Sequence, residues 1–166
     1  MTSVEMRNNL LFMRNEFHVS GRWEFPIIAK QDIPLDKVGL IAYANTKLND
    51  TSENKRCGVH FFVDDYRFTG TYNNPVRSFD KLSPYAFLLS PDFSTYEDMN
   101  FWRQFESVAH SRWVGAYWQS KGLKVIPTIT WSDARSYCFC FDSIEKGSIV
   151  AVGMIGCKTT IHNLVK

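Results

Sequence analysis

The stretch GVHFFVDD, residues 58–65, is a run of apolar side chains that ends in two adjacent acids. Three later stretches have the same form: YAFLLSPDFS (85–94), KVIPTITWSD (124–133) and SIVAVGMIGCK (148–158). Near-continuous Val, Ile, Leu and Phe, in place of alternating apolar and polar residues, are typical of strands that are buried on both faces of a sheet. The four runs therefore predict four buried strands.

Helical segments separate these strands. The segment NNPVRSFDKLS predicts a short helix of about two turns, because Asn74 can cap it and Pro75 suits the first helical position. Residues 95–121 predict a long helix, opened by the capping box Ser94-x-x-Glu97 and closed by Gly122.

A third helix is expected between residues 132 and 147, with Ser132 as its cap. Alternating strands and helices predict an α/β fold with a parallel sheet of repeated βα units. FPIIA (25–29) and VGLIAYAN (38–45) add an expected strand and a strand or helix.

A full (β/α) barrel takes about 250 residues, so the 166 residues here predict at most a partial, barrel-like closure within a single domain. Residues 25–158 are expected to form the βα-repeat domain. Residues 1–24 are expected to be a helical or irregular segment that packs on it, and 159–166 a short tail. The last predicted strand has no closing helix after it, so the N-terminal segment MRNNLLFMRNEF or a second copy of the chain is expected to cover that edge.

The long helix is expected to have two faces. The apolar face is predicted to pack on the sheet and the polar face to meet water; the apolar side chains are Trp102, Phe105, Ala109, Trp113 and Ala116, and the polar ones Arg103, Ser107, His110 and Ser111. Arg112 lies at the edge of the apolar stripe and needs a partner, for which a rim aspartate is one candidate. Trp118 falls on the polar side, which predicts an interface or lid contact or a surface indole.

Composition limits the classes of function. With 45% apolar and 22% charged residues the chain is of the globular, soluble type, and a formal charge of +2 disfavours non-specific nucleic-acid binding. The absence of a long apolar run and of a leader pattern predicts a cytoplasmic protein without a membrane partner. The four cysteines are expected to be free thiols, and aromatic residues reach 15%, which favours a binding surface.

Ligand sites of parallel α/β folds lie beyond the carboxyl ends of the strands. We call this edge the rim. The candidate binding residues are those that follow the strands, together with two from the long helix: Asp64, Asp65, Arg67, Ser90, Asp92, Ser94, Trp131, Ser132, Asp133, Cys157 and Lys158, with Arg112 and Trp118.

Carboxylates on successive strand ends allow two kinds of chemistry. Asp64, Asp65 and Asp92 suit a divalent cation such as Mg²⁺ or Mn²⁺, or an acid and base pair, and Arg67, Arg112 and Lys158 could hold an anion. Asp133 is explained equally well as a turn former or helix cap. No dinucleotide, P-loop, zincin or α/β-hydrolase motif is present.

The series HFFVDDYRF, NNP, LLSPDFSTY, SRWVGAYWQSKGLKVIPTITWSD and CFDSIEKGSIVAVGMIGCK resembles the family called domain of unknown function 4417, over residues of about 25–158. Members occur in bacteria, phages and other mobile elements and have no established activity. The resemblance therefore implies a phage or mobile-element protein without naming a reaction. Members commonly continue with a further helix and strand where this chain has TTIHNLVK, which favours a shortened, partner-binding version.

Two hypotheses of function remain. The first is a non-catalytic accessory protein that binds a host or phage protein through an aromatic-rich surface, in modulation of defence or replication. The second is an Mg²⁺- or Mn²⁺-assisted enzyme that acts on a phosphorylated or nucleotide-like small molecule at the aspartates of the rim.

Overall fold

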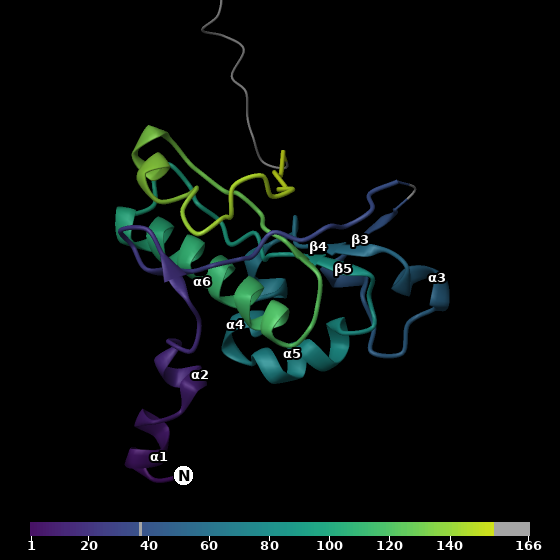
Figure 1. Cartoon of the computed structure of the whole chain (residues 1–166), viewed down its shortest axis with the longest axis horizontal. Helices are drawn as coiled ribbons and strands as arrows, with labels where there is room; N and C mark the ends of the chain where they lie inside the picture. The colour runs from purple at the N-terminus through teal and green to yellow at the C-terminus, as the bar shows by residue number, and fades with distance from the viewer. Residues whose placement is uncertain (37, 155–166) are drawn as a thin grey trace, which may run out of the picture.

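The computed structural model describes residues 1–36 and 38–154 (Figure 1). The helices and strands are α1 (Ser3–Arg7), α2 (Leu10–Met13), β1 (Val19–Ser20), β2 (Phe25–Pro26), β3 (Leu40–Ala42), the 3₁₀ helix η1 (Tyr43–Asn45), α3 (Ser52–Lys55), β4 (Gly58–His60), η2 (Asp65–Arg67), α4 (Gly70–Asn73), α5 (Pro75–Leu82), β5 (Phe87–Leu89), α6 (Phe101–Ser120), β6 (Val125–Ile126) and η3 (Ala134–Cys138).

A parallel sheet forms the centre of the fold, with strand order β3-β4-β5-β6. Three of the four apolar runs thus form neighbouring parallel strands, as predicted, and the segment 38–45 supplies the edge strand β3. The fourth run is reduced to one parallel bridge between Thr128 and Ala151, and its residues 155–158 lie outside the described part. The α/β class is confirmed, whereas a barrel-like closure stays a prediction.

The segment 25–29 does not join this sheet. Phe25 and Pro26 pair with β1 as a small antiparallel ribbon, and Ile28 forms a single parallel bridge with Ile144. The ribbon lies against α6, so it forms a layer of its own on that helix.

The short helix α5 begins as predicted. The side chain of Asn74 accepts a hydrogen bond from the Arg77 N–H at 3.3 Å, and Pro75 is at the first helical position. Helices α4 and α5 lie together beside the sheet (Figure 1).

The long helix α6 ends as predicted but begins later. Gly122 follows its end with a φ of +86°, a left-handed conformation that glycine adopts without strain. The predicted capping box does not form, because the Ser94 backbone N–H and hydroxyl both donate to the Asp65 carboxylate instead. The helix starts at Phe101, directly after Asn100.

The two-faced character expected of α6 is wrong for its second half. Residues 111–118 are buried on every side, while Trp102 of the expected apolar face is 61% exposed. The helix lies between β6 and the ribbon, so no water-facing side remains there. A Cβ on Gly115 would lie 2.4 Å from Ile28 Cδ1, so any other residue there would force the Ile28 side chain to shift.

Aromatic side chains fill the core. Trp118 is fully buried and stacks on Phe61 with ring centroids 5.5 Å apart, and Phe61 stacks in turn on Tyr43 at 5.1 Å. The prediction of an exposed Trp118 is therefore wrong, because the helix face that carries it meets the sheet and not solvent.

The N-terminal helices α1 and α2 project from the body and contain no buried residue (Figure 1). Leu11 of α2 packs against the main core cluster, and Arg14 donates to the Tyr72 carbonyl at 2.8 Å and lies 4.0 Å from the Trp113 ring centroid. Phe17 also contacts Trp113. The segment thus meets α4 and α6, and the expectation that it covers the last strand at Ala151 is wrong.

Within residues 1–36 and 38–154, none of the helices combines the length and the apolar character needed to span a bilayer.

Candidate functional site

Asp65 and Ser94 join two neighbouring strand ends on the rim. The Ser94 hydroxyl donates to Asp65 Oδ1 at 2.8 Å, and its backbone N–H donates to Oδ2 at 3.0 Å. Both carboxylate oxygens of Asp65 are therefore engaged in holding the loop after β5 against the loop after β4. This contact brings two predicted site residues together and gives them a structural task.

Asp92 is the carboxylate of the rim with the most altered chemistry. Burial raises its pKa to about 6, with the nearby charge of Asp65 acting in the same direction and the Thr130 hydroxyl, which donates to its carboxylate, opposing both. A Cβ on Gly153 would lie 3.2 Å from Asp92 Oδ2, so the segment after Ala151 passes directly over the carboxyl group. Asp92 is thus partly buried beneath the chain.

Asp64 does not join the other two aspartates. Its side chain is 74% exposed and faces Arg67 at 3.9 Å, a pair accessible to solvent. In the described residues no group of three or more His, Cys, Asp or Glu side chains gathers in a way that could hold a metal ion. The predicted three-aspartate metal centre is therefore not assembled.

A small pocket of about 240 Å³ lies between Asp65 and α6. His110 lines it, stacks on Tyr72 with centroids 3.7 Å apart, and has Glu106 at 3.7 Å. Burial lowers the pKa of His110, so the imidazole is predominantly neutral at pH 7. Sequence reasoning placed His110 on a water-facing helix side and missed this stack.

Two other predicted site residues lie inside the protein. Ser90 is fully buried, where its hydroxyl contacts that of Ser111 and accepts from the Thr128 N–H at 2.8 Å. Arg112 is 1% exposed and donates to the carbonyls of Thr128, Cys140 and Asp142 at 3.0, 2.7 and 3.0 Å.

No aspartate carboxylate accepts from Arg112 among the described residues, so the expected pairing with a rim aspartate is wrong. Burial lowers the pKa of Arg112 to about 10, which leaves it charged at neutral pH. Because a guanidinium is a rigid, planar donor, it fixes the three carbonyls relative to one another. Arg112 therefore joins the end of β6 to residues 140–142.

These residues flank an exposed aromatic cluster, which we define as Trp131, Tyr137 and Phe141. The Phe141 ring lies 6.4 Å from Trp131 and 5.9 Å from Tyr137, measured between centroids. The three side chains are 40%, 51% and 50% exposed, respectively. Trp131 was predicted on the rim, whereas the other two were missed; the aromatic-rich run SYCFCF was the available signal.

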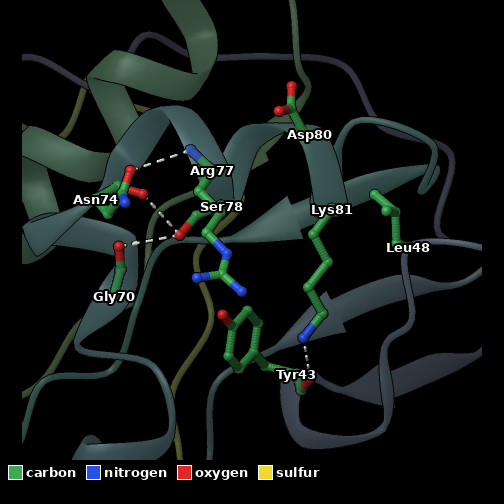
Figure 2. A pocket seen from close by; sticks show the side chains of 8 residues that line it. All are labelled: Tyr43, Leu48, Gly70, Asn74, Arg77, Ser78, Asp80 and Lys81. Carbon is green, nitrogen blue, oxygen red and sulfur yellow. Dashed lines mark hydrogen bonds between the residues drawn. The ribbon is translucent and has the colours of Figure 1, made fainter.

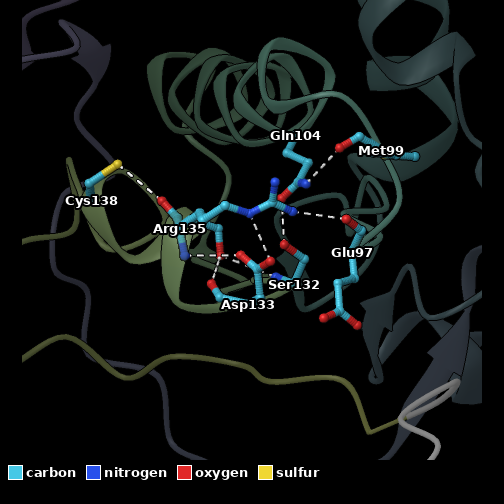
Figure 3. A network of polar contacts seen from close by, with 8 residues as sticks. Glu97, Met99, Gln104, Ser132, Asp133, Arg135 and Cys138 are labelled. Atoms are coloured by element: carbon cyan, nitrogen blue, oxygen red, sulfur yellow. Dashed lines mark hydrogen bonds and ion pairs between the residues drawn. The ribbon is translucent and has the colours of Figure 1, made fainter.

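A polar network lies between η3 and the start of α6 (Figure 3). Gln104 of α6 is fully buried, donates to the Met99 carbonyl at 3.0 Å and accepts from the Ser132 hydroxyl. Asp133 caps η3 by accepting from the Arg135 backbone N–H, and its other oxygen pairs with Arg135 Nε at 2.8 Å.

Asp133 thus acts as a helix cap, and Ser132, predicted as that cap, contacts Gln104 instead. The network holds η3 against the start of α6. Lys158 and Cys157 lie outside the described residues.

The chain resembles proteins of two mycobacteriophages. It is 36% identical over 153 residues to the Gene 1 protein of Mycobacterium phage L5, which covers 92% of this chain and 66% of that protein. It is 40% identical over 102 residues to the Gene 1 protein of Mycobacterium phage D29, covering 61% of this chain and 38% of that protein. This chain therefore spans less than two thirds of either relative.

No solved structure matches the chain. The profile of one protein family matches residues 17–165, which is most of the sequence and includes every strand end described above. The chain belongs to the family described as Domain of unknown function (DUF4417).

Proposed function

We propose that this chain is a non-catalytic accessory protein of a phage or mobile element and that it binds a host or phage protein through the aromatic cluster Trp131, Tyr137 and Phe141. The observation that carries the proposal is that the Phe141 ring contacts both Trp131 and Tyr137, and that the three side chains are each 40–51% exposed. Aromatic residues are enriched in the cores of protein interfaces, where a few of them supply most of the binding energy.

Rigidity of the cluster supports the same function. Arg112 holds Thr128 and residues 140–142 from below, and the network around Gln104 holds η3 at its side. A surface that is already ordered before binding loses little conformational entropy on association. The cluster is therefore suited to bind a partner without rearranging.

The relatives support the setting of the proposal. Both are phage proteins, which would place this chain in the cytoplasm of an infected or lysogenic bacterium. Modulation of host defence or of replication is the class of task that fits such a protein.

The metal-assisted enzyme has weaker support, because the described residues offer no group of metal ligands. What favours catalysis is Asp92, whose raised pKa of about 6 next to Asp65 is typical of an acid and base pair. Asp92 lies beneath Gly153, however, and both oxygens of Asp65 already accept hydrogen bonds. Incubation of the protein with Mn²⁺ and a panel of nucleoside phosphates tests this second candidate, and turnover abolished by Asp92→Asn would establish it.

The binding proposal is tested with the tagged protein in a mycobacterial lysate, followed by identification and purification of any captured protein and measurement of its affinity for the chain. Phe141→Ser should weaken the reconstituted complex by roughly 30-fold or more, since an interface aromatic residue typically contributes about 2 kcal/mol.

Tyr96→Ser is the matched control, because Tyr96 is 58% exposed and lies outside the cluster. It should leave the affinity unchanged. Equal affinities of Phe141→Ser and the unmodified chain would refute the proposal. A homodimer that Phe141→Ser dissociates would also refute it, because the second copy of the chain would then occupy the cluster.

A further inference from the structure

A second surface feature lies on the α5 side of the sheet, far from η3 (Figure 1). It is a groove of about 490 Å³ between η1 and helices α4 and α5, open on one side. We call it the α5 groove (Figure 2), and its lining residues are Tyr43, Leu48, Gly70, Asn74, Arg77, Ser78, Asp80 and Lys81.

Two cationic side chains enter the α5 groove from successive turns of one helix. Lys81 Nζ lies 4.1 Å from the Tyr43 ring centroid and 3.5 Å from the Tyr43 carbonyl oxygen. The Arg77 guanidinium reaches towards the hydroxyl end of the same tyrosine, while the Asp80 carboxylate points away from both cations (Figure 2). The spacing of four residues places the two charges on one face of α5.

Neither cation is neutralised by a carboxylate in the described part of the chain. Three other surface arginines face an acid: Arg67 faces Asp64, Arg103 faces Glu106 and Arg135 faces Asp133. Among residues 1–36 and 38–154, no such ion pair forms at Arg77 or Lys81. The groove wall takes the place of part of the hydration of the Lys81 ammonium group, and this burial lowers the pKa of Lys81.

We propose that the α5 groove binds a small phosphate monoester, with Arg77 and Lys81 holding the phosphate group. A guanidinium donates two parallel hydrogen bonds to phosphate oxygens, and an ammonium group adds a compact charge beside it. The Tyr43 hydroxyl and the Asn74 side chain supply neutral hydrogen-bonding groups for the rest of the ligand.

The size of the groove fits this class of ligand, because small-molecule sites are typically about 300–1,000 Å³. A groove of this volume can hold a ligand of the size of a mononucleotide or a sugar phosphate. The proposal is independent of the aromatic cluster, because the segment 131–141 that carries the cluster and helix α5 lie at different sides of the molecule (Figure 1). Either proposal can therefore fail without the other.

Calorimetric titration in a phosphate-free buffer tests the proposal, with adenosine 5′-monophosphate and ribose 5-phosphate as probes and adenosine and ribose as their unphosphorylated counterparts. Saturable binding of at least one phosphorylated probe is expected, without binding of its counterpart. Arg77→Gln and Lys81→Gln should each weaken that binding about tenfold or more.

Arg56→Gln is the control, since Arg56 is an exposed arginine at the end of α3 that lies outside the groove. A third variant, Gly70→Leu, keeps both cations but adds a side chain where a Cβ meets open space at the groove wall, and it should also weaken binding. Absence of saturable binding by both phosphorylated probes up to ~10 mM would overturn the proposal. Equal affinities of the Arg77→Gln and Arg56→Gln variants would overturn it as well, because the phosphate would then be bound elsewhere.

Discussion

Replacing Arg112 with methionine should lower the free energy of unfolding by about 3–5 kcal/mol. The methionine side chain is unbranched and apolar and can occupy much of the same space, but it removes all three hydrogen bonds to the carbonyls of Thr128, Cys140 and Asp142. A buried carbonyl left without a donor costs about 1–3 kcal/mol, and part of that sum is offset because no charge has to be desolvated. For a chain of this size the midpoint of thermal unfolding should fall by about 6–20 °C.

Urea unfolding followed by tryptophan fluorescence measures this change. Arg103→Met is the matched control, because Arg103 lies on the same helix, its side chain is 47% exposed and it pairs with Glu106 at the surface. Such a pair contributes about 1 kcal/mol or less. Equal losses of stability in the two variants would refute the reasoning that Arg112 joins the end of β6 to residues 140–142.

Two further predictions concern single side chains. Asp92→Asn keeps an acceptor for the Thr130 hydroxyl but removes the titration of the side chain. A carboxyl pKa raised from 3.8 to about 6 stabilises the fold at low pH, and this contribution is lost as the pH rises through that range. The free energy of unfolding of the variant, relative to that of the unmodified chain, should therefore increase by up to about 3 kcal/mol between pH ~4 and ~7 in urea titrations. A difference that does not vary with pH would contradict the buried state of Asp92. Gly115→Ala should destabilise the fold by about 1–3 kcal/mol in thermal unfolding, although alanine favours helices, because the added Cβ would collide with Ile28. Gly70→Ala, whose Cβ meets open space, should be nearly neutral. Similar effects of the two substitutions would show that α6 and Ile28 are not in close contact.

The sequence was sufficient for the elements whose signals are local. Uninterrupted apolar runs identified β4, β5 and β6, and Asn74 with Pro75 identified the start of α5. The start of α6 was predicted six residues too early, since Ser94 has a capping pattern in sequence but donates to Asp65 across the sheet. A tertiary contact of this kind has no local signature.

The candidate site was predicted only in part for the same reason. Following the strand ends found Asp65, Ser94 and Asp92 and placed Trp131 at the surface. The prediction for Trp118 was wrong, because helical periodicity assumes that one side of a helix faces water, whereas both sides of α6 are covered there.

Periodicity of the helix also could not supply the partners of Arg112, which are backbone carbonyls of a segment with little regular structure. The aromatic cluster emerged only once Tyr137 and Phe141 were placed beside Trp131 by that segment.

Site-specific photo-crosslinking at position 137 tests the central claim most directly. A photoreactive phenylalanine analogue in place of Tyr137, expressed in mycobacterial cells, should form a covalent adduct with one defined protein, and the same analogue at position 96 should not. That adduct should disappear when Phe141→Ser is combined with the analogue. Two results would contradict the assignment of the aromatic cluster as the binding surface. One is an adduct with the same protein from both positions, and the other is the absence of any adduct when the analogue is at position 137 and Phe141 is unmodified.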